Sequence, residues 1–148
     1  MKSPVEQFTI KTLVPLEAFG YDISFTNASL FMVLSVIVSS LFLYLGIKKS
    51  SLIPNRFQSS VELLYEFVSN MVKENVGTGG KKYFPFIFSL FMFILFGNLL
   101  GMIPYSYTFT SQIIVTITLA LIIFIGVTLI ALITVSYTHL TLPTMMSV

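Results

Sequence analysis

The chain has 148 residues, of which 55% are hydrophobic and 9% are charged, and its formal net charge is +2 at pH 7. Ordinary soluble domains carry about 25% charged residues, so this composition is typical of a membrane protein and gives no indication of a nucleic-acid partner. The sequence contains no cysteine and a single histidine, which excludes disulfides, thiolate metal sites and cysteine nucleophiles. We therefore expect neither a metal nor a cofactor.

Residues 1–27 mix charged and scattered apolar side chains and include two prolines. This pattern predicts a short segment outside the membrane, with a helical turn near its surface. The segment lacks the basic region followed by an apolar region that marks a cleavable signal peptide. Asn27 is a candidate cap for the helix that follows.

Residues 28–47 form the first of three uncharged stretches and are 20 residues long. At about 1.5 Å per residue, such a helix covers about 30 Å, the thickness of the hydrocarbon core of a bilayer. A soluble helix this uniformly apolar would have no face to turn toward water. We predict that this stretch is a transmembrane helix.

The connection after the first span carries its own pattern. Apolar side chains recur at helical spacing at Phe57, Val61, Leu64, Val68, Met71 and Val72. They predict an amphipathic helix over about 56–76 that lies at the membrane interface or packs on partners. Asn55 is a start signal, Ser59 with Glu62 is a candidate capping box, and Gly77 is a stop signal.

Two further uncharged stretches follow, at 84–103 (20 residues) and 113–135 (23 residues), joined by a short polar loop. A loop this short makes the two spans antiparallel neighbours. The predicted fold class is therefore all-α, a polytopic membrane protein with three transmembrane helices and one interfacial amphipathic helix.

The basic residues predict the orientation. Six of the eight lie in the 48–82 connection: Lys48, Lys49, Arg56, Lys73, Lys81 and Lys82. Because basic residues concentrate on the inner side of membranes, we expect this connection to face the cytoplasm or matrix. The N-terminus and the 105–112 loop would then face outward.

Candidate functional residues are few, because no carboxylate follows Glu74 and the spans hold no triad, metal cluster or acid–base pair. Asn98 is the amide inside a span, where it either ties helices together or lines a watery path. Gly97 and Gly101 flank it as G-x-x-x-G, which allows close helix approach. Gln112 lies where the third span enters the membrane, either as an interfacial cap or as a functional polar residue.

Three segments resemble a known family: FTNASLFM (25–32), LIPNRFQSSVELLYEFVSNMVKENVG (52–77) and KYFPFIFSLFMFILFGNLLGMIPYSYTFTSQIIVT (82–116). They are similar to subunit a of the F-type ATP synthase, in its alphaproteobacterial and mitochondrial branch. The likeness runs from about residue 3 to about residue 130.

The resemblance implies a stator subunit of the membrane sector, with the c-ring and b subunits as partners and protons as the transported ion. It implies two aqueous half-channels, and an essential arginine that keeps a c-ring carboxylate ionised between them. Such a subunit is non-catalytic. It resides in the bacterial inner membrane or, alternatively, in the mitochondrial inner membrane.

The sequence departs from that pattern after the third span. No arginine follows Arg56, so we expect residues 1–134 to be the N-terminal part of the family's membrane domain, unable to conduct protons alone. Residues 135–148 are unlike the family and form an atypical tail. Asn98 matches a family asparagine suspected of lining the outward half-channel, whereas Gln112 stands where relatives often carry histidine. The alternative is a free-standing structural or assembly protein of the membrane.

Overall fold

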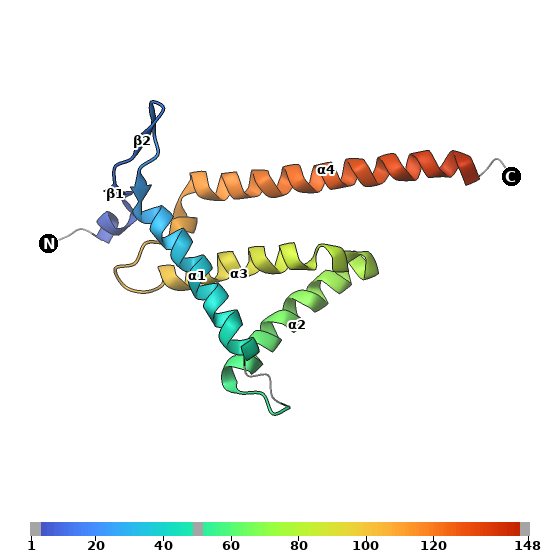
Figure 1. The fold of residues 1–148 in the computed structure, drawn as a ribbon, viewed down its shortest axis with the longest axis horizontal. Helices are drawn as coiled ribbons and strands as arrows, with labels where there is room; N and C mark the ends of the chain where they lie inside the picture. The colour runs from blue at the N-terminus through green and yellow to red at the C-terminus, as the bar shows by residue number, and fades with distance from the viewer. Residues whose placement is uncertain (1–3, 49–51, 146–148) are drawn as a thin grey trace. The chain divides into compact units, whose positions relative to one another are not determined.

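The computed structural model describes residues 4–48 and 52–145, which divide into two compact units, Met1–Thr110 and Ser111–Val148. The helices in order are α1 (Asn27–Lys48), α2 (Arg56–Val76), α3 (Phe84–Gly101) and α4 (Ile113–Met145) (Figure 1). Three helices of the described part are long and apolar enough to cross a membrane: α1, α3 and Ile113–Tyr137 of α4. The three predicted spans are confirmed, and the chain is an all-α, multi-pass membrane protein.

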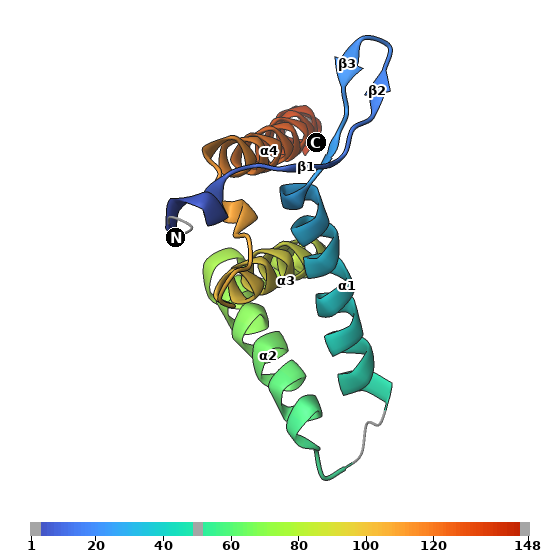
Figure 2. The ribbon, with the colours of Figure 1, turned by 90° about the vertical axis from the view of Figure 1, so that its left-hand side faces the viewer.

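A small β-hairpin precedes α1 and was not predicted from the sequence. It follows the 3₁₀ turn η1 (Pro4–Phe8), which matches the predicted helical turn. Strand β1 (Thr12–Val14) pairs with β4 (Phe25–Thr26), and β2 (Glu17–Ala18) pairs with β3 (Tyr21–Asp22) (Figure 2). Phe19 and Gly20 close the hairpin with φ angles of 54° and 80°. Positive φ at both positions is the geometry that matches the right-handed twist of paired strands.

Asn27 joins this hairpin to α1. Its side-chain oxygen accepts hydrogen bonds from the backbone N–H groups of Ala28 (3.0 Å) and Lys11 (3.2 Å). Its side-chain nitrogen donates to the carbonyl oxygen of Thr9 (3.1 Å). The predicted capping contact at the start of α1 is confirmed, and the same amide also holds residues 9 and 11, which lead into β1.

One face of α1 consists of small residues, and they are the buried ones: Ala28, Ser35, Ser39 and Gly46. The two serine hydroxyls donate to carbonyls of their own helix, at 2.7 and 3.0 Å, so they need no partner across the interface. A Cβ added at Gly46 would lie 2.5 Å from Cγ2 of Val61. Because small side chains let helix backbones approach closely, this face sets how α1 meets α2 and α3.

Asn55 caps the N-terminus of α2. Its side-chain oxygen accepts from the backbone N–H of Arg56 at 2.8 Å. The candidate capping box is wrong, because Ser59 lies inside the helix, and Glu62 accepts from the side-chain nitrogen of Gln58 at 2.7 Å instead. The helix begins four residues too early for Ser59 to act as a cap.

Replacing Asn55 with alanine is expected to destabilise α2 by about 1 kcal/mol, the usual cost of losing an N-cap. The measurement is thermal unfolding of the detergent-solubilised chain, followed by circular dichroism. Asn70→Ala is the matched control, because Asn70 is exposed in the same helix and alanine is the better helix former. An equal loss of stability in the two variants would contradict the capping role.

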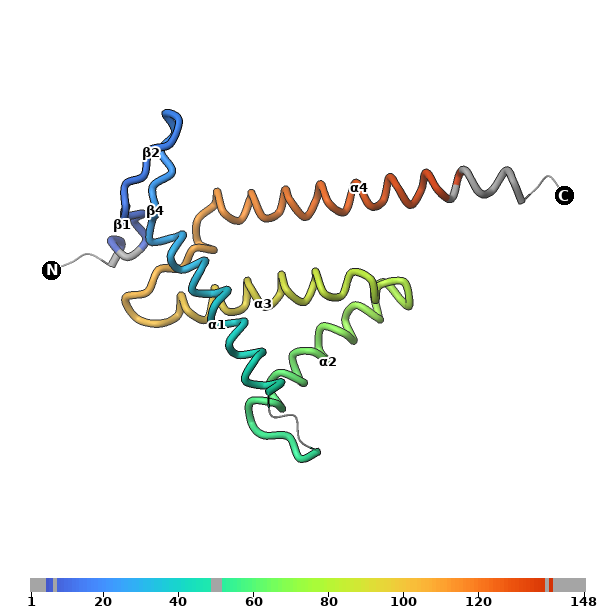
Figure 3. Tube along the Cα trace, in the orientation of Figure 1, coloured from blue at the N-terminus to red at the C-terminus, as the bar shows by residue number. Residues whose placement is uncertain are grey.

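The apolar stripe of α2 packs within the chain. Its buried or half-buried members are Val61, Leu64, Val68 and Val72, whereas Phe57 and Met71 of the predicted stripe are exposed. The ring of Tyr65 meets that of Phe84 edge-on at 4.9 Å between centroids. Figure 3 traces the resulting triangle, in which α2 leaves the end of α1 and returns to the start of α3. The α2 helix therefore contacts two of the spans within the chain, whereas its predicted position at the membrane interface or against partners stays a prediction.

The second unit is dominated by α4, whose span has no buried residue. Hydroxyls of Thr118, Thr128 and Thr134 donate to the carbonyls four residues earlier, at 2.7, 2.7 and 2.8 Å. With its polar groups satisfied internally, such a helix is suited to lipid or to partner helices. The predicted span of 113–135 agrees with the apolar segment Ile113–Tyr137, and the helix itself continues to Met145 through most of the expected tail. The α3 helix of the first unit stops at Gly101, two residues earlier than the predicted end of its span.

Candidate functional site

The candidate site is the C-terminal end of α3 together with the loop that follows it. Asn98 lies in the last turn of α3 and is exposed. Its side-chain oxygen accepts a 2.6 Å hydrogen bond from the hydroxyl of Thr110. Its side-chain nitrogen has no hydrogen-bond partner within the ranges that the structure describes. The amide is therefore fixed at its oxygen and still has a donor to offer.

The loop that carries Thr110 is anchored to the end of α3 by two other hydroxyls. Ser106 donates to the carbonyl of Leu100 at 2.6 Å, and Thr108 donates to the carbonyl of Gly101 at 3.2 Å. The last carbonyls of a helix have no partner within it, so these side chains complete the hydrogen bonding of α3. The path of the loop, and with it the position of Thr110, follows from these contacts.

The two glycines beside Asn98 receive the same loop. A Cβ on Gly97 would meet the ring of Phe109, with Cε1 at 2.6 Å, and a Cβ on Gly101 would meet Thr108, with its Cβ at 2.8 Å. Phe109 is 1% exposed and its ring lies 5.2 Å from that of Phe93. In this chain the nearest atoms to the glycine pair belong to the loop, and the predicted role of the pair in packing between helices stays a prediction.

Gln112 belongs to the second unit and immediately precedes α4. Its backbone carbonyl accepts from the N–H groups of Val115 and Thr116, both at 3.2 Å, and the residue is half-buried. This backbone geometry is that of a helix N-cap position. Whether the side chain takes part in a proton path stays a prediction.

Thr110 is the site residue that the sequence does not reveal. It lies twelve positions after Asn98 and on the far side of a turn, where no helical or strand periodicity relates the two residues. The sequence indicates only that a hydroxyl in the loop after this span could be the partner of the Asn98 amide. That clue does not distinguish Thr110 from Thr108.

The chemistry open to this site is limited by its lack of charge. No Asp, Glu, Lys or Arg occurs after Lys82 in the sequence. In the described residues no group of three or more His, Cys, Asp or Glu side chains could hold a metal ion. An amide and a hydroxyl can orient water by hydrogen bonding, but neither is an acid or base near neutral pH.

Comparison with known proteins gives consistent matches. The family model described as ATP synthase A chain matches residues 29–148. ATP synthase subunit a of Paramagnetospirillum magneticum is 55% identical over 133 residues, covering 88% of this chain and 54% of that protein. The same subunit of Rhodospirillum rubrum is 55% identical over 130 residues, with the same coverage. That of Parvibaculum lavamentivorans is 52% identical over 126 residues, covering 85% and 48%. The chain spans about half the length of these curated relatives.

Proposed function

Because the chain belongs to the ATP synthase A chain family, we propose that it serves as a stator subunit in the membrane sector of an ATP synthase. In this role it contributes to a proton half-channel and performs no catalytic step itself. Its partners are the c-ring and the b subunits, and its location is a bacterial inner membrane. Family membership favours this function over the free-standing structural or assembly protein considered from the sequence.

The observation that supports a channel role is the state of Asn98. Its oxygen accepts from Thr110 at 2.6 Å, while its nitrogen has no hydrogen-bond partner in the described residues, and Asn98 is an exposed residue in a predominantly apolar helix. An unsatisfied N–H group facing hydrocarbon is costly, so a water molecule or a polar partner group is favoured beside it. Asn98 would hold and orient such a water molecule in the path of protons without itself being protonated.

The proposed orientation places this amide near the outer surface. The lysine-bearing connection precedes Phe84, so α3 starts on the cytoplasmic side and ends at Gly101 on the outer side. Asn98 then lies about 4.5 Å from the outer end of the helix, at 1.5 Å per residue. Gln112, which begins the return span, is the second proton-path residue of the proposal.

The test uses the absence of cysteine from the chain. Asn98→Cys is introduced into the full chain, which is reconstituted in liposomes and treated with a water-soluble, membrane-impermeant maleimide. Reaction requires the thiolate, and the thiolate requires water. We expect Asn98→Cys to react at least about tenfold faster than Leu99→Cys, because a thiol facing lipid stays protonated.

Leu99 is the matched control, since it lies at the same depth in α3 and is 47% exposed. Equally slow labelling at both positions would contradict an aqueous path and would leave Asn98 as a structural residue that fixes the loop. Labelling from the cytoplasmic side alone would contradict the proposed orientation.

A further inference from the structure

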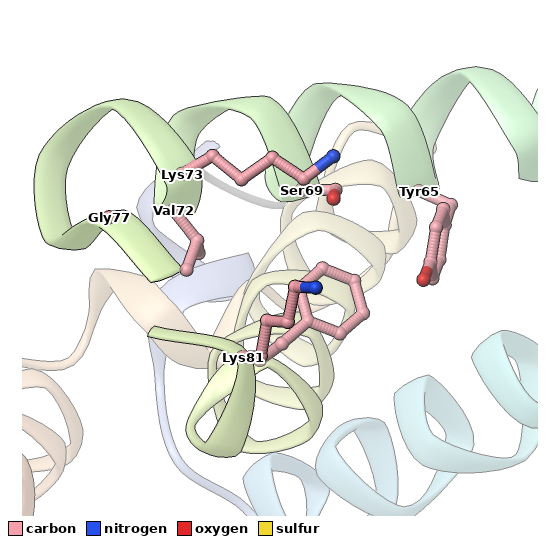
Figure 4. A pocket seen from close by; sticks show the side chains of 7 residues that line it. Tyr65, Ser69, Val72, Lys73, Gly77 and Lys81 are labelled. Atoms are coloured by element: carbon pink, nitrogen blue, oxygen red, sulfur yellow. The ribbon is translucent and has the colours of Figure 1, made fainter. Parts of the chain in front are cut away.

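A hollow of about 430 Å³ lies between the C-terminal half of α2, the 3₁₀ turn η2 (Gly77–Lys82) and the start of α3 (Figure 4). It is remote in sequence from the Asn98 site and has no part in the proposed proton path. Its lining residues are Tyr65, Ser69, Val72, Lys73, Gly77, Lys81 and Phe84. The volume is in the range of sites that bind small molecules or headgroups.

The polar lining of the hollow is cationic. Tyr65, Ser69 and Lys73 follow one another at four-residue spacing, which places them along one edge of α2. Lys73 lies along α2 with its ammonium group beside Ser69, and Lys81 approaches from η2, so that both lysines line the hollow from different elements (Figure 4).

The residues that line the hollow include no carboxylate to balance these two charges. The acidic residues of α2 (Glu62, Glu66 and Glu74) are absent from the lining. Neither lysine has an ion-pair partner within residues 4–48 and 52–145. The hollow therefore offers two unneutralised cations together with the hydroxyls of Ser69 and Tyr65, a donor set that suits a phosphate group.

The position of the hollow indicates where such a phosphate would come from. Phe84 lines the hollow and is also the first residue of α3, one of the helices apolar enough to span the membrane. The opening thus lies at the level where an apolar span gives way to lysines, which is the headgroup level of a bilayer. Tyr65 is 50% exposed and packs edge-on against Phe84, so apolar surface adjoins the cations.

We propose that this hollow binds the phosphodiester headgroup of an anionic membrane phospholipid. Lys73 and Lys81 neutralise the phosphate, the hydroxyls of Ser69 and Tyr65 donate to its oxygens, and the acyl chains run beside the Tyr65 and Phe84 rings. Basic pockets at the inner ends of transmembrane helices are suited to such headgroups. The bound lipid would hold α2 against the start of α3.

The experiment measures lipid binding by native mass spectrometry of the full chain in detergent, titrated with phosphatidylglycerol. The variants are Lys73→Gln with Lys81→Gln, and, as a control, Lys82→Gln. Lys82 has the same charge and adjoins Lys81 but does not line the hollow. We expect the double variant to bind phosphatidylglycerol at least about tenfold more weakly than the wild type, and Lys82→Gln to bind it unchanged.

Further arms separate the alternatives. Lys73→Arg with Lys81→Arg keeps the charges and is expected to keep the binding, which separates a lost site from a misfolded chain. Phosphatidylcholine is expected to bind at least about tenfold more weakly than phosphatidylglycerol, because its headgroup has no net charge. An equal loss of binding in Lys82→Gln and in the double variant (Lys73→Gln with Lys81→Gln), or equal binding of the two lipids, would overturn the proposal. Displacement of phosphatidylglycerol by equimolar inorganic phosphate would likewise overturn it in favour of a free-anion site.

Discussion

Gly97→Ala is expected to destabilise the first unit by about 1–3 kcal/mol, the usual cost of overpacking a well-filled core. The added Cβ would collide with the ring of Phe109, whose Cε1 would lie 2.6 Å away. This ring cannot move freely, because it is 1% exposed and packs against Phe93 at 5.2 Å. Displacing the ring would also shift Thr110, the next residue, and would weaken its hydrogen bond to Asn98.

Gly126→Ala provides the matched control. Gly126 lies in the middle of α4, and a Cβ there would meet nothing within 4 Å. Alanine is the better helix former, so this variant is expected to be neutral or more stable by up to about 1 kcal/mol. The measurement is denaturation of both variants in mixed micelles by increasing amounts of sodium dodecyl sulfate. If Gly97→Ala were as stable as Gly126→Ala, the result would contradict the close packing of the Phe109 ring against Gly97 of α3.

The spans could be predicted from the sequence because the free energy of transferring a long uncharged stretch into the bilayer decides where they lie. An uncharged stretch of 20 or more residues is stable in hydrocarbon only as a helix, so composition alone predicts α1, α3 and most of α4. The end of α3 was predicted less accurately, because the helix stops two residues before the end of the predicted span. Met102 and Ile103 are as apolar as the helix but lie beyond its end, where Ser106 and Thr108 take up the last carbonyls.

The hairpin before α1 was missed for a related reason. Its turn is Phe19-Gly20, whereas the usual sequences for two residues with positive φ carry Asn or Asp at the first position. The strands are two or three residues long, too short for alternation to be visible. Asn27 was predicted only as a cap. Its side chain forms hydrogen bonds both with Thr9 and Lys11, before the hairpin, and with Ala28 in α1.

The site could be predicted in part only. Asn98 was identified because an amide in an apolar helix is conspicuous, and that cost is a local property of the sequence. Its partner Thr110 depends on the course of the whole loop, which is set by side-chain contacts to the helix end and by the Phe109 ring against Gly97. The close packing of α1 could have been predicted from the sequence, because its small residues recur on one helix face at positions 28, 35, 39 and 46.

Thr110→Val tests the pair directly and is expected to destabilise the first unit by about 1–2 kcal/mol. Valine keeps the shape of threonine but removes the hydroxyl that donates to Asn98 at 2.6 Å. In a double-mutant cycle with Asn98→Leu, we expect a coupling free energy of about 0.6–1.7 kcal/mol, between the average and the maximum for side-chain hydrogen bonds in a membrane protein. Stabilities from dodecyl sulfate titration of the two single variants and the double variant complete the cycle.

Thr118→Val controls for the loss of a hydroxyl as such. Thr118 donates to the carbonyl of Ile114 in its own helix at 2.7 Å, and that carbonyl keeps its place in the helical ladder when the hydroxyl is removed. We expect this variant to change stability by less than about 0.5 kcal/mol. A coupling near zero between positions 98 and 110 would mean that the Asn98 amide finds an equivalent partner without Thr110. Thr110 would then not fix the orientation of the Asn98 amide, and the proposed proton path would lose its oriented N–H group.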